Sequence, residues 1–350
     1  MEYLPLFIAY MSVCLGFAIL YSLGDQPFMT TGFIGKLRQH AWRTVELMIP
    51  KSLWRIGASI ITSLFFKRNR TFQMLYLFMN LSSHVVLVVD ILPYLYVFHP
   101  TQNHTLAPLI LFIIGTILYI VCCISDPGEI NHKNYAQYVD MYKYDGVLYQ
   151  EDNACQTCDF IKPARSKHCS TCDICIFKFD HHCVWTNRCV GGRNQRYFLI
   201  FMVALCMMVG NGVYMACWVL HNITVYQNLW SAKYVDHNGV ARDMTLVLLV
   251  QHLFMQFPRI VFLATGMGAI AALLIGFTIY HFYLAVFNQT TNERYKRFYL
   301  ASRKGSVDSV NVYDRGLTNN LLEVLSPMQH VSKQEKKNNN VIHEPKIKKR

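Results

Sequence analysis

The chain has 350 residues, of which 53% are hydrophobic and only 15% are charged. Because soluble domains usually carry about 25% charged residues, this composition argues against an ordinary soluble enzyme. The formal net charge is +12, but the basic residues gather on one side of the predicted membrane segments, so no nucleic-acid partner is expected. A membrane protein is the class that fits.

Apolar runs predict five membrane-spanning helices. A helical crossing of the bilayer needs about 20 apolar residues, and runs of that length lie at 4–23, 72–92, 106–124, 198–220 and 260–284. The first run has no basic segment before it and no clean cleavage site after it, so we expect an anchored helix rather than a removable signal peptide. We expect the shorter apolar piece at 246–257 to be a luminal interfacial helix, or an extension of the last span interrupted at Pro258.

The distribution of Lys and Arg predicts the orientation. Segments 24–71, 125–197 and 288–350 contain 8, 9 and 13 of the 33 basic residues, whereas segments 99–105 and 221–245 contain 0 and 2. Basic loops are retained on the cytosolic side of a membrane. The asymmetry therefore places the N-terminus outside and the tail in the cytosol, together with the cysteine-rich middle segment.

Seven of the twelve cysteines lie between Cys155 and Cys189. A disulfide framework does not suit this cluster, because the cytosol is reducing and an odd number of thiols cannot all pair. Cysteines two residues apart are typical ligand pairs of structural zinc, which takes four thiolate or imidazole ligands. The seven cysteines and three nearby histidines make ten donors, of which two zinc ions use eight. A segment this short cannot bury a core unaided, so its fold should depend on metal.

The predicted fold class is an α-helical polytopic membrane protein, with about five transmembrane helices and a small cytosolic two-zinc cysteine-rich domain. Its predicted parts are, in chain order, a first transmembrane helix (1–23), a cytosolic basic loop (24–71), the second and third helices (72–124), the cytosolic zinc-binding domain (125–197), the fourth and fifth helices with a luminal loop (198–287) and a cytosolic tail (288–350). The cysteine-rich domain thus directly precedes the fourth helix, at the edge of the membrane.

Two of the ten donors are left over after both zinc ions are placed, and a purely structural zinc domain has no need for them. The sequence Asp180-His181-His182-Cys183 supplies a thiol, an imidazole that can take its proton and a carboxylate that can orient the imidazole. A neighbouring histidine and the cations Lys178 and Arg188 would lower the pKa of such a thiol and favour its thiolate. The spacing alone does not show which cysteine is free of metal.

The run from Cys155 to Phe198 resembles the cysteine-rich domain of the DHHC family of protein S-acyltransferases. It contains KPARSKHC at 162–169 and DHHCVWTNRC at 180–189. Three further marks of the family are Asp-Pro-Gly at 126–128, Thr-Thr-Asn-Glu at 290–293 and NVYDRGLTNNL at 311–321. Two positions depart from the commonest pattern: Arg188 stands where Asn is frequent, and Val312 where Pro is frequent. Neither position holds a ligand or a reactive group, so the implied chemistry is unaffected.

The resemblance implies a site as well as a fold. It assigns one zinc ion to Cys155, Cys158, His168 and Cys175, and the other to Cys169, Cys172, His182 and Cys189. The two donors that are left are Cys183, implied to be the nucleophile, and His181, implied to be the base that Asp180 orients. The implied reaction moves a palmitoyl group from palmitoyl-CoA to cysteines of membrane-associated proteins, by a ping-pong mechanism through acyl-Cys183.

The polyanionic end of an acyl-CoA needs cationic partners, and the candidates are Lys162, Arg165 and Lys167. A solvated basic loop is the alternative for these three residues. Cys122 and Cys123, at the cytosolic edge of the third span, are candidates for acylation themselves.

Two other functions and several compartments stay open from the sequence. A membrane-anchored RING-like ubiquitin ligase also binds two zinc ions, and a zinc-finger scaffold needs no reactive thiol at all. The last five residues, KIKKR at 346–350, resemble a dilysine retrieval signal, which predicts the endoplasmic reticulum membrane, with the Golgi or the plasma membrane as alternatives.

Overall fold

The computed structural model describes residues 40, 50–63, 67–235, 239–304 and 311–327. The predicted first span at 4–23 and the predicted retrieval signal at 346–350 lie outside these residues. The described part before Lys67 contains one helix, α4 (Lys51–Ile61), whose apolar side chains such as Trp54 and Ile56 are exposed.

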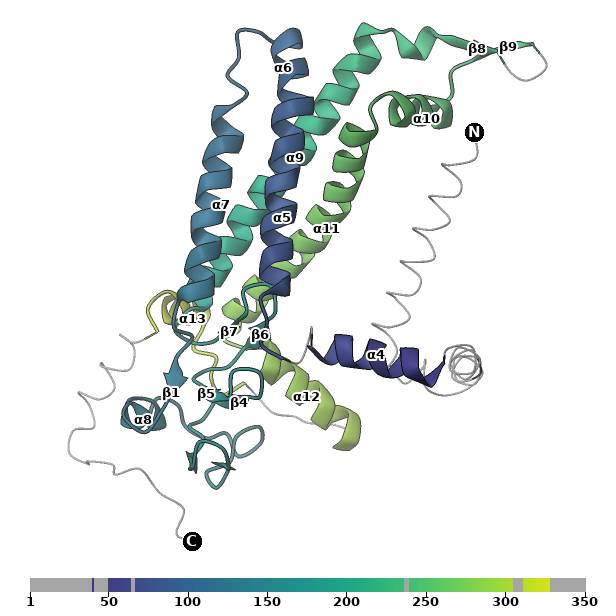
Figure 1. Cartoon of the computed structure of the whole chain (residues 1–350). Helices are drawn as coiled ribbons and strands as arrows, with labels where there is room; N and C mark the ends of the chain where they lie inside the picture. Colours follow the sequence, from purple (N-terminus) through teal and green to yellow (C-terminus); the bar gives the residue numbers. More distant parts are fainter. Residues whose placement is uncertain (1–39, 41–49, 64–66, 236–238, 305–310, 328–350) are drawn as a thin grey trace. The chain divides into compact units, whose positions relative to one another are not determined.

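Within the described residues, four helices are long and apolar enough to cross a membrane. The first runs from Thr71 to Phe98, as α5 (Thr71–Val86), the π-helical turn η2 (Leu87–Ile91) and α6 (Leu92–Phe98). The others are α7 (Leu106–Ile124), α9 (Gln195–Tyr226) and α11 (Pro258–Val286). Four of the five predicted spans are thereby confirmed. In Figure 1 these helices stand side by side, and α9 packs against both α7 and α11.

Proline and asparagine residues explain an irregular turn inside the first of these spans and the boundaries of the later helices. Pro93 has no N–H for the carbonyl one turn earlier, and the helix widens to a π-turn just before it. Asn194 directly precedes α9, and its side chain ties the start of the helix to the β7 segment by accepting from the Gly191 N–H and donating to the Cys189 carbonyl. The apolar piece at 246–257 forms α10 (Leu246–Gln256), a separate helix that ends before Pro258, the first residue of α11.

The end of the bundle remote from the cysteine-rich segment is stabilised by an apolar core and an ion pair. The core includes Leu95, Ala216 and Val219, which are fully buried. Beside it, the Arg259 guanidinium lies 2.7 Å from a carboxylate oxygen of Asp90. The connection between α9 and α10 contains the turn η3 (Leu229–Ser231) and a hairpin of β8 (Lys233–Val235) and β9 (Ala241–Asp243).

Short hairpins make up the cysteine-rich segment. A three-stranded sheet has the order β1 (Glu129–Ile130), β5 (Ile174–Ile176), β4 (Lys167–Cys169), and two hairpins pair β2 (Ala154–Cys155) with β3 (Phe160–Ile161) and β6 (His181–Cys183) with β7 (Arg188–Val190). All the pairings are antiparallel. The helix α8 (Tyr135–Val139) packs its Tyr135 and Tyr138 into a small core with Phe177.

Close backbone packing joins this segment to the bundle. A Cβ added at Gly191 would lie 2.5 Å from the Pro127 carbonyl oxygen, and one at Gly192 would lie 2.6 Å from the Phe177 ring. Only glycine permits this approach, which fixes the β6–β7 hairpin against the end of α7 and the start of α9. The tail adds α12 (Thr291–Lys304) and α13 (Leu317–Leu325), and α13 packs on α9 and α11.

Candidate functional site

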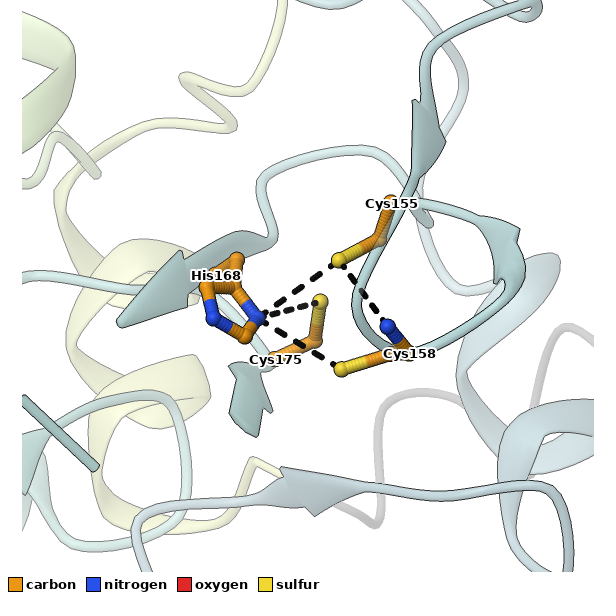
Figure 2. Close-up of side chains that lie close together, drawn as sticks. All are labelled: Cys155, Cys158, His168 and Cys175. Atoms are coloured by element: carbon orange, nitrogen blue, oxygen red, sulfur yellow. Dashed lines mark hydrogen bonds between the residues drawn. The ribbon is translucent and has the colours of Figure 1, made fainter. Parts of the chain in front are cut away.

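The first cysteine and histidine cluster brings together four predicted ligands from three strands and a turn (Figure 2). The Nδ1 atom of His168 lies 3.5 Å from the Cys155 sulfur, 3.5 Å from the Cys158 sulfur and 3.9 Å from the Cys175 sulfur. In tetrahedral zinc sites, bonds of about 2.3 Å to sulfur and about 2.0 Å to nitrogen separate the two ligand atoms by about 3.5 Å. The donor set and its spacing therefore fit a zinc ion.

The second cluster repeats this arrangement. The sulfurs of Cys169, Cys172 and Cys189 lie 3.7, 3.4 and 3.6 Å from the Nδ1 atom of His182. The two clusters interleave, since Cys169 on β4 and Cys175 on the paired strand β5 belong to different clusters. Metal in either cluster would therefore stabilise the hairpin that both share.

Strand geometry separates the leftover donors from the metal ligands. Side chains alternate between the two faces of a strand, so His181 and Cys183 on β6 share one face while His182 points to the other, toward the second cluster. Among the described residues, the two clusters use eight of the ten predicted donors and leave Cys183 and His181 outside. The Cys183 side chain packs near Val190 and Phe198, where α9 enters the bundle.

His181 is held by a buried carboxylate. Its Nδ1 atom lies 2.6 Å from a carboxylate oxygen of Asp180, and Asp180 is only 3% exposed. The other carboxylate oxygen accepts from the Thr291 N–H at 2.6 Å, and the Thr291 hydroxyl donates to the Asp180 carbonyl at 2.8 Å. The start of α12 thus fixes the carboxylate that fixes the imidazole.

The electrostatics of this group favour a thiolate. Burial alone would raise the pKa of the Cys183 thiol, but the hydrogen bond and positive charge of His181, with help from Thr186, lower it to about 7. Burial would lower the pKa of His181, but hydrogen bonds to Asp180 and Cys183 outweigh it and raise the pKa to about 10. At pH 7 about half of the Cys183 thiol is therefore ionised beside a protonated His181.

A third polar side chain reaches this group from the membrane bundle, and the sequence reasoning missed it. His281 of α11 is 1% exposed, and its Nδ1 atom lies 3.9 Å from a carboxylate oxygen of Asp180. Its ring packs against those of His181 and Phe198, with centroids 5.6 and 5.1 Å apart. An ionisable residue inside an apolar span often marks a functional site, and that signal was present in the sequence.

Arg165, one of the three predicted phosphate partners, lies in a buried ion pair. Arg165 is fully buried, with its guanidinium 2.7 Å from the Glu293 carboxylate and hydrogen-bonded to Asn288. Lys178 is also buried, and its ammonium lies 2.7 Å from the carboxylate of Glu323 on α13. Both cations join the tail to the cysteine-rich segment, so Lys178 does not act on the thiol as an unpaired charge.

The other two predicted cations remain available for an anion. Lys162 and Lys167 line a small open cavity together with Lys296 of α12, Tyr149 and Gln150. Lys296 approaches the cavity from over the Tyr149 ring, 4.4 Å from its centroid. Lys296 lies more than a hundred residues further along the chain, which explains why motif spacing did not reveal it.

Comparisons with known proteins agree with this geometry. The family model for the DHHC palmitoyltransferase domain matches residues 148–297. Proteins named palmitoyltransferase ZDHHC4 from Bos taurus and Mus musculus are 33% and 32% identical, each over 93% of this chain and 97% of the relative. Palmitoyltransferase SWF1 from Yarrowia lipolytica is 33% identical over 60% of this chain and 55% of its own length. Because the ZDHHC4 similarity extends over nearly the whole of both chains and includes the cysteine-rich segment, this protein belongs to the DHHC palmitoyltransferase family.

Proposed function

We propose that the chain transfers a long-chain acyl group, palmitoyl in the first instance, from acyl-CoA to protein cysteines through a thioester on Cys183. The observation that carries the proposal is a thiol outside both four-ligand clusters that shares a strand face with His181, whose imidazole lies against the Asp180 carboxylate. Neither a RING-like ligase nor a zinc scaffold requires a thiol prepared in this way.

In the first step the Cys183 thiolate attacks the carbonyl carbon of the acyl-CoA thioester. The bond between that carbon and the CoA sulfur breaks, and the His181 imidazolium gives its proton to the departing CoA thiolate. Asp180 accepts from the Nδ1 side of the ring, which leaves the Nε2 side for the sulfur chemistry. The products are free CoA, neutral His181 and acyl-Cys183.

In the second step neutral His181 takes the proton of an acceptor cysteine. The acceptor sulfur attacks the acyl carbon, and Cys183 departs as the thiolate that began the cycle. Because His181 gives one proton and recovers one, the cycle needs no other acid or base. The same pair thus serves both half-reactions.

The two clusters would hold structural zinc. The ligands are Cys155, Cys158, His168 and Cys175 in one and Cys169, Cys172, His182 and Cys189 in the other. Four protein ligands complete a tetrahedral site, which is typical of structural rather than catalytic zinc. Each ion would contribute on the order of 10 kcal/mol to folding, so the cytosolic zinc-binding domain at 125–197 is expected to fold only with metal.

The acyl donor would bridge the cytosol and the membrane. Lys162, Lys167 and Lys296 are the proposed partners of its phosphates, because they share one cavity. The acyl chain would enter the bundle beside Cys183, which packs against the apolar cluster that contains the buried side chains of Phe198 and Met202. At about 0.8 kcal/mol for each buried methylene, a palmitoyl chain gains on the order of 10 kcal/mol from this transfer.

An active site at the cytosolic membrane surface selects its acceptors by location. A single acyl chain gives only marginal membrane binding, so we expect the acceptors to be proteins already held at the membrane by a span, a lipid or a basic patch. The endoplasmic reticulum is the proposed compartment, on the strength of the KIKKR sequence at 346–350, with the Golgi or plasma membrane as alternatives.

The test uses purified full-length protein and labelled palmitoyl-CoA without an acceptor. We expect a hydroxylamine-sensitive label that is lost in Cys183→Ser, while that variant keeps its full zinc content. A label that survives the substitution would contradict the proposed nucleophile. A variant that lost zinc would assign Cys183 to the metal scaffold instead.

A further inference from the structure

We propose that Cys123 is a second acylation site of this enzyme and that it receives its acyl group from the Cys183 thioester rather than directly from acyl-CoA. The inference rests on the proposed function of Cys183. It concerns the last turn of α7, which no step of the transfer to external acceptors uses.

Two side chains near Cys123 donate hydrogen bonds to Trp185 and Thr186, which follow Cys183 closely in the chain. Tyr119 lies one helical turn before Cys123 and therefore on the same face of α7, and its hydroxyl donates to the Trp185 carbonyl at 2.9 Å. The Gln73 amide donates to the Thr186 carbonyl at 3.0 Å. Cys123 itself packs against the cluster that contains Tyr119.

Trp185 also packs directly on a membrane helix. The Trp185 ring packs edge-on against Phe72 at the start of α5, with centroids 5.3 Å apart. The contact places the residues that directly follow Cys183 between the start of α5 and the end of α7. A thioester on Cys183 is therefore formed two residues before a segment that contacts the face of α7 on which Cys123 lies, and this raises the local concentration of the acceptor.

The surface around Cys123 suits an alkyl chain, and its neighbour provides a contrast. Ile120 and Ile124 flank it on α7 and are 49% and 72% exposed, as expected of side chains that face lipid. Cys123 is half-buried at the edge of the cluster that Tyr119 and Phe201 form, whereas Cys122 is 5% exposed and is one of the buried members of that cluster. An acyl group on Cys123 has lipid beside it, while one on Cys122 would have to displace packed side chains.

The step is a thioester exchange and needs no further reactant. The Cys123 thiol gives its proton to neutral His181, directly or through water, and its sulfur attacks the acyl carbon on Cys183. The bond between the acyl carbon and the Cys183 sulfur breaks, and Cys183 becomes a thiolate again. One thioester is lost and one is gained, so a second acyl-CoA can then reload Cys183.

The experiment follows acylation of the full-length enzyme in nanodiscs with palmitoyl-CoA and no protein acceptor. Acid-quenched samples are digested, and acylated peptides are identified by mass spectrometry over time. We expect acyl-Cys183 to appear first and acyl-Cys123 later, and Cys123→Ser to carry acyl only on Cys183. The matched variant Cys122→Ser should acquire both groups. In Cys183→Ser, whose zinc content reports on folding, the label on Cys123 should be lost.

A chase of the wild-type enzyme makes the route visible without any substitution. After donor is removed, acyl should pass from Cys183 to Cys123 while the total label stays constant. Equal labelling of Cys123 in Cys183→Ser would overturn the transfer, since the group would then come from acyl-CoA directly. Wild-type enzyme acylated on Cys183 alone would overturn the second site but leave the proposed function standing. Absence of acyl-Cys183 itself would contradict both.

Discussion

His181 should set the reactivity of the Cys183 thiol, and His181→Gln tests this. The pKa of Cys183 falls from an ordinary 9.0 to about 7 through its contact with His181, against the effect of burial. Two units correspond to about 2.7 kcal/mol of preference for the thiolate. Without the histidine, burial would hold the pKa at or above its ordinary value. At pH 7 the thiolate fraction would then fall from about one half to about one per cent or less.

Alkylation of Cys183 by iodoacetamide measures this fraction without requiring activity. In the wild type, the rate of Cys183 labelling, followed by mass spectrometry, should rise with pH and approach a plateau above about pH 7. In His181→Gln the rate at pH 7 should fall by about 50-fold or more, whereas the exposed histidine variant His132→Gln should match the wild type. An unchanged rate in His181→Gln would refute the electrostatic reasoning, because some other group would then be holding the thiolate.

Three further predictions concern the donor site, the metal and the tail. Lys296→Gln should raise the KM for acyl-CoA about fivefold with kcat unchanged, because it removes a partly exposed charge contact worth about 1 kcal/mol. Steady-state kinetics measure this, with the exposed Lys133→Gln variant as the control. An equal KM in the two variants would contradict the prediction. Cys175→Ser should lose zinc measured by elemental analysis, and full retention would show that this cysteine is no ligand. Glu323→Gln should lower the free energy of unfolding by about 3–5 kcal/mol, because it leaves a buried cation unpaired. Thermal unfolding in detergent should show a lower transition temperature for this variant but not for the exposed Glu151→Gln variant. An unchanged transition temperature would show that the tail does not contribute to stability through this network.

The parts of the fold that follow from short-range pattern were predictable from the sequence. An apolar run of sufficient length determines a membrane helix by itself, so 106–124 matches α7 residue for residue. The two cysteines of each Cys-x2-Cys pair lie three positions apart, a spacing typical of zinc ligands. The number of ligands and of metal clusters was therefore also predictable from the sequence. The alternation of β6 explains why neighbouring His181 and His182 have different roles, and this required the strand to be known.

The long-range contacts were not predictable in the same way. Arg165 belongs to a basic motif, but its backbone adopts a left-handed conformation with φ of 65° and its side chain turns inward to Glu293, 128 residues further along the chain. Spacing along the chain does not show that pairing. The same is true of Lys296 and His281, which join the site only because α11 and α12 fold back on the cysteine-rich segment.

The buried ion network explains why the tail carries sequence marks of its own. Glu323 accepts from Lys178 at 2.7 Å and from the Tyr142 hydroxyl at 2.5 Å, and the Asn288 amide donates to it at 2.8 Å. Buried charges persist when each is paired. The helix α13 therefore joins the buried ion network of the cysteine-rich segment through Glu323 rather than forming a separate appendage.

A single-turnover transfer from isolated acyl-enzyme tests most directly whether acyl-Cys183 is an intermediate of the reaction. Enzyme loaded with labelled palmitoyl-CoA is freed of donor by gel filtration and mixed with a membrane-anchored acceptor peptide that contains one cysteine. Label should leave Cys183 at the rate at which acyl-peptide appears, with no acyl-CoA present. Acyl-peptide that forms only when acyl-CoA is added back would show that the Cys183 thioester is not an intermediate and would contradict the proposed two-step transfer.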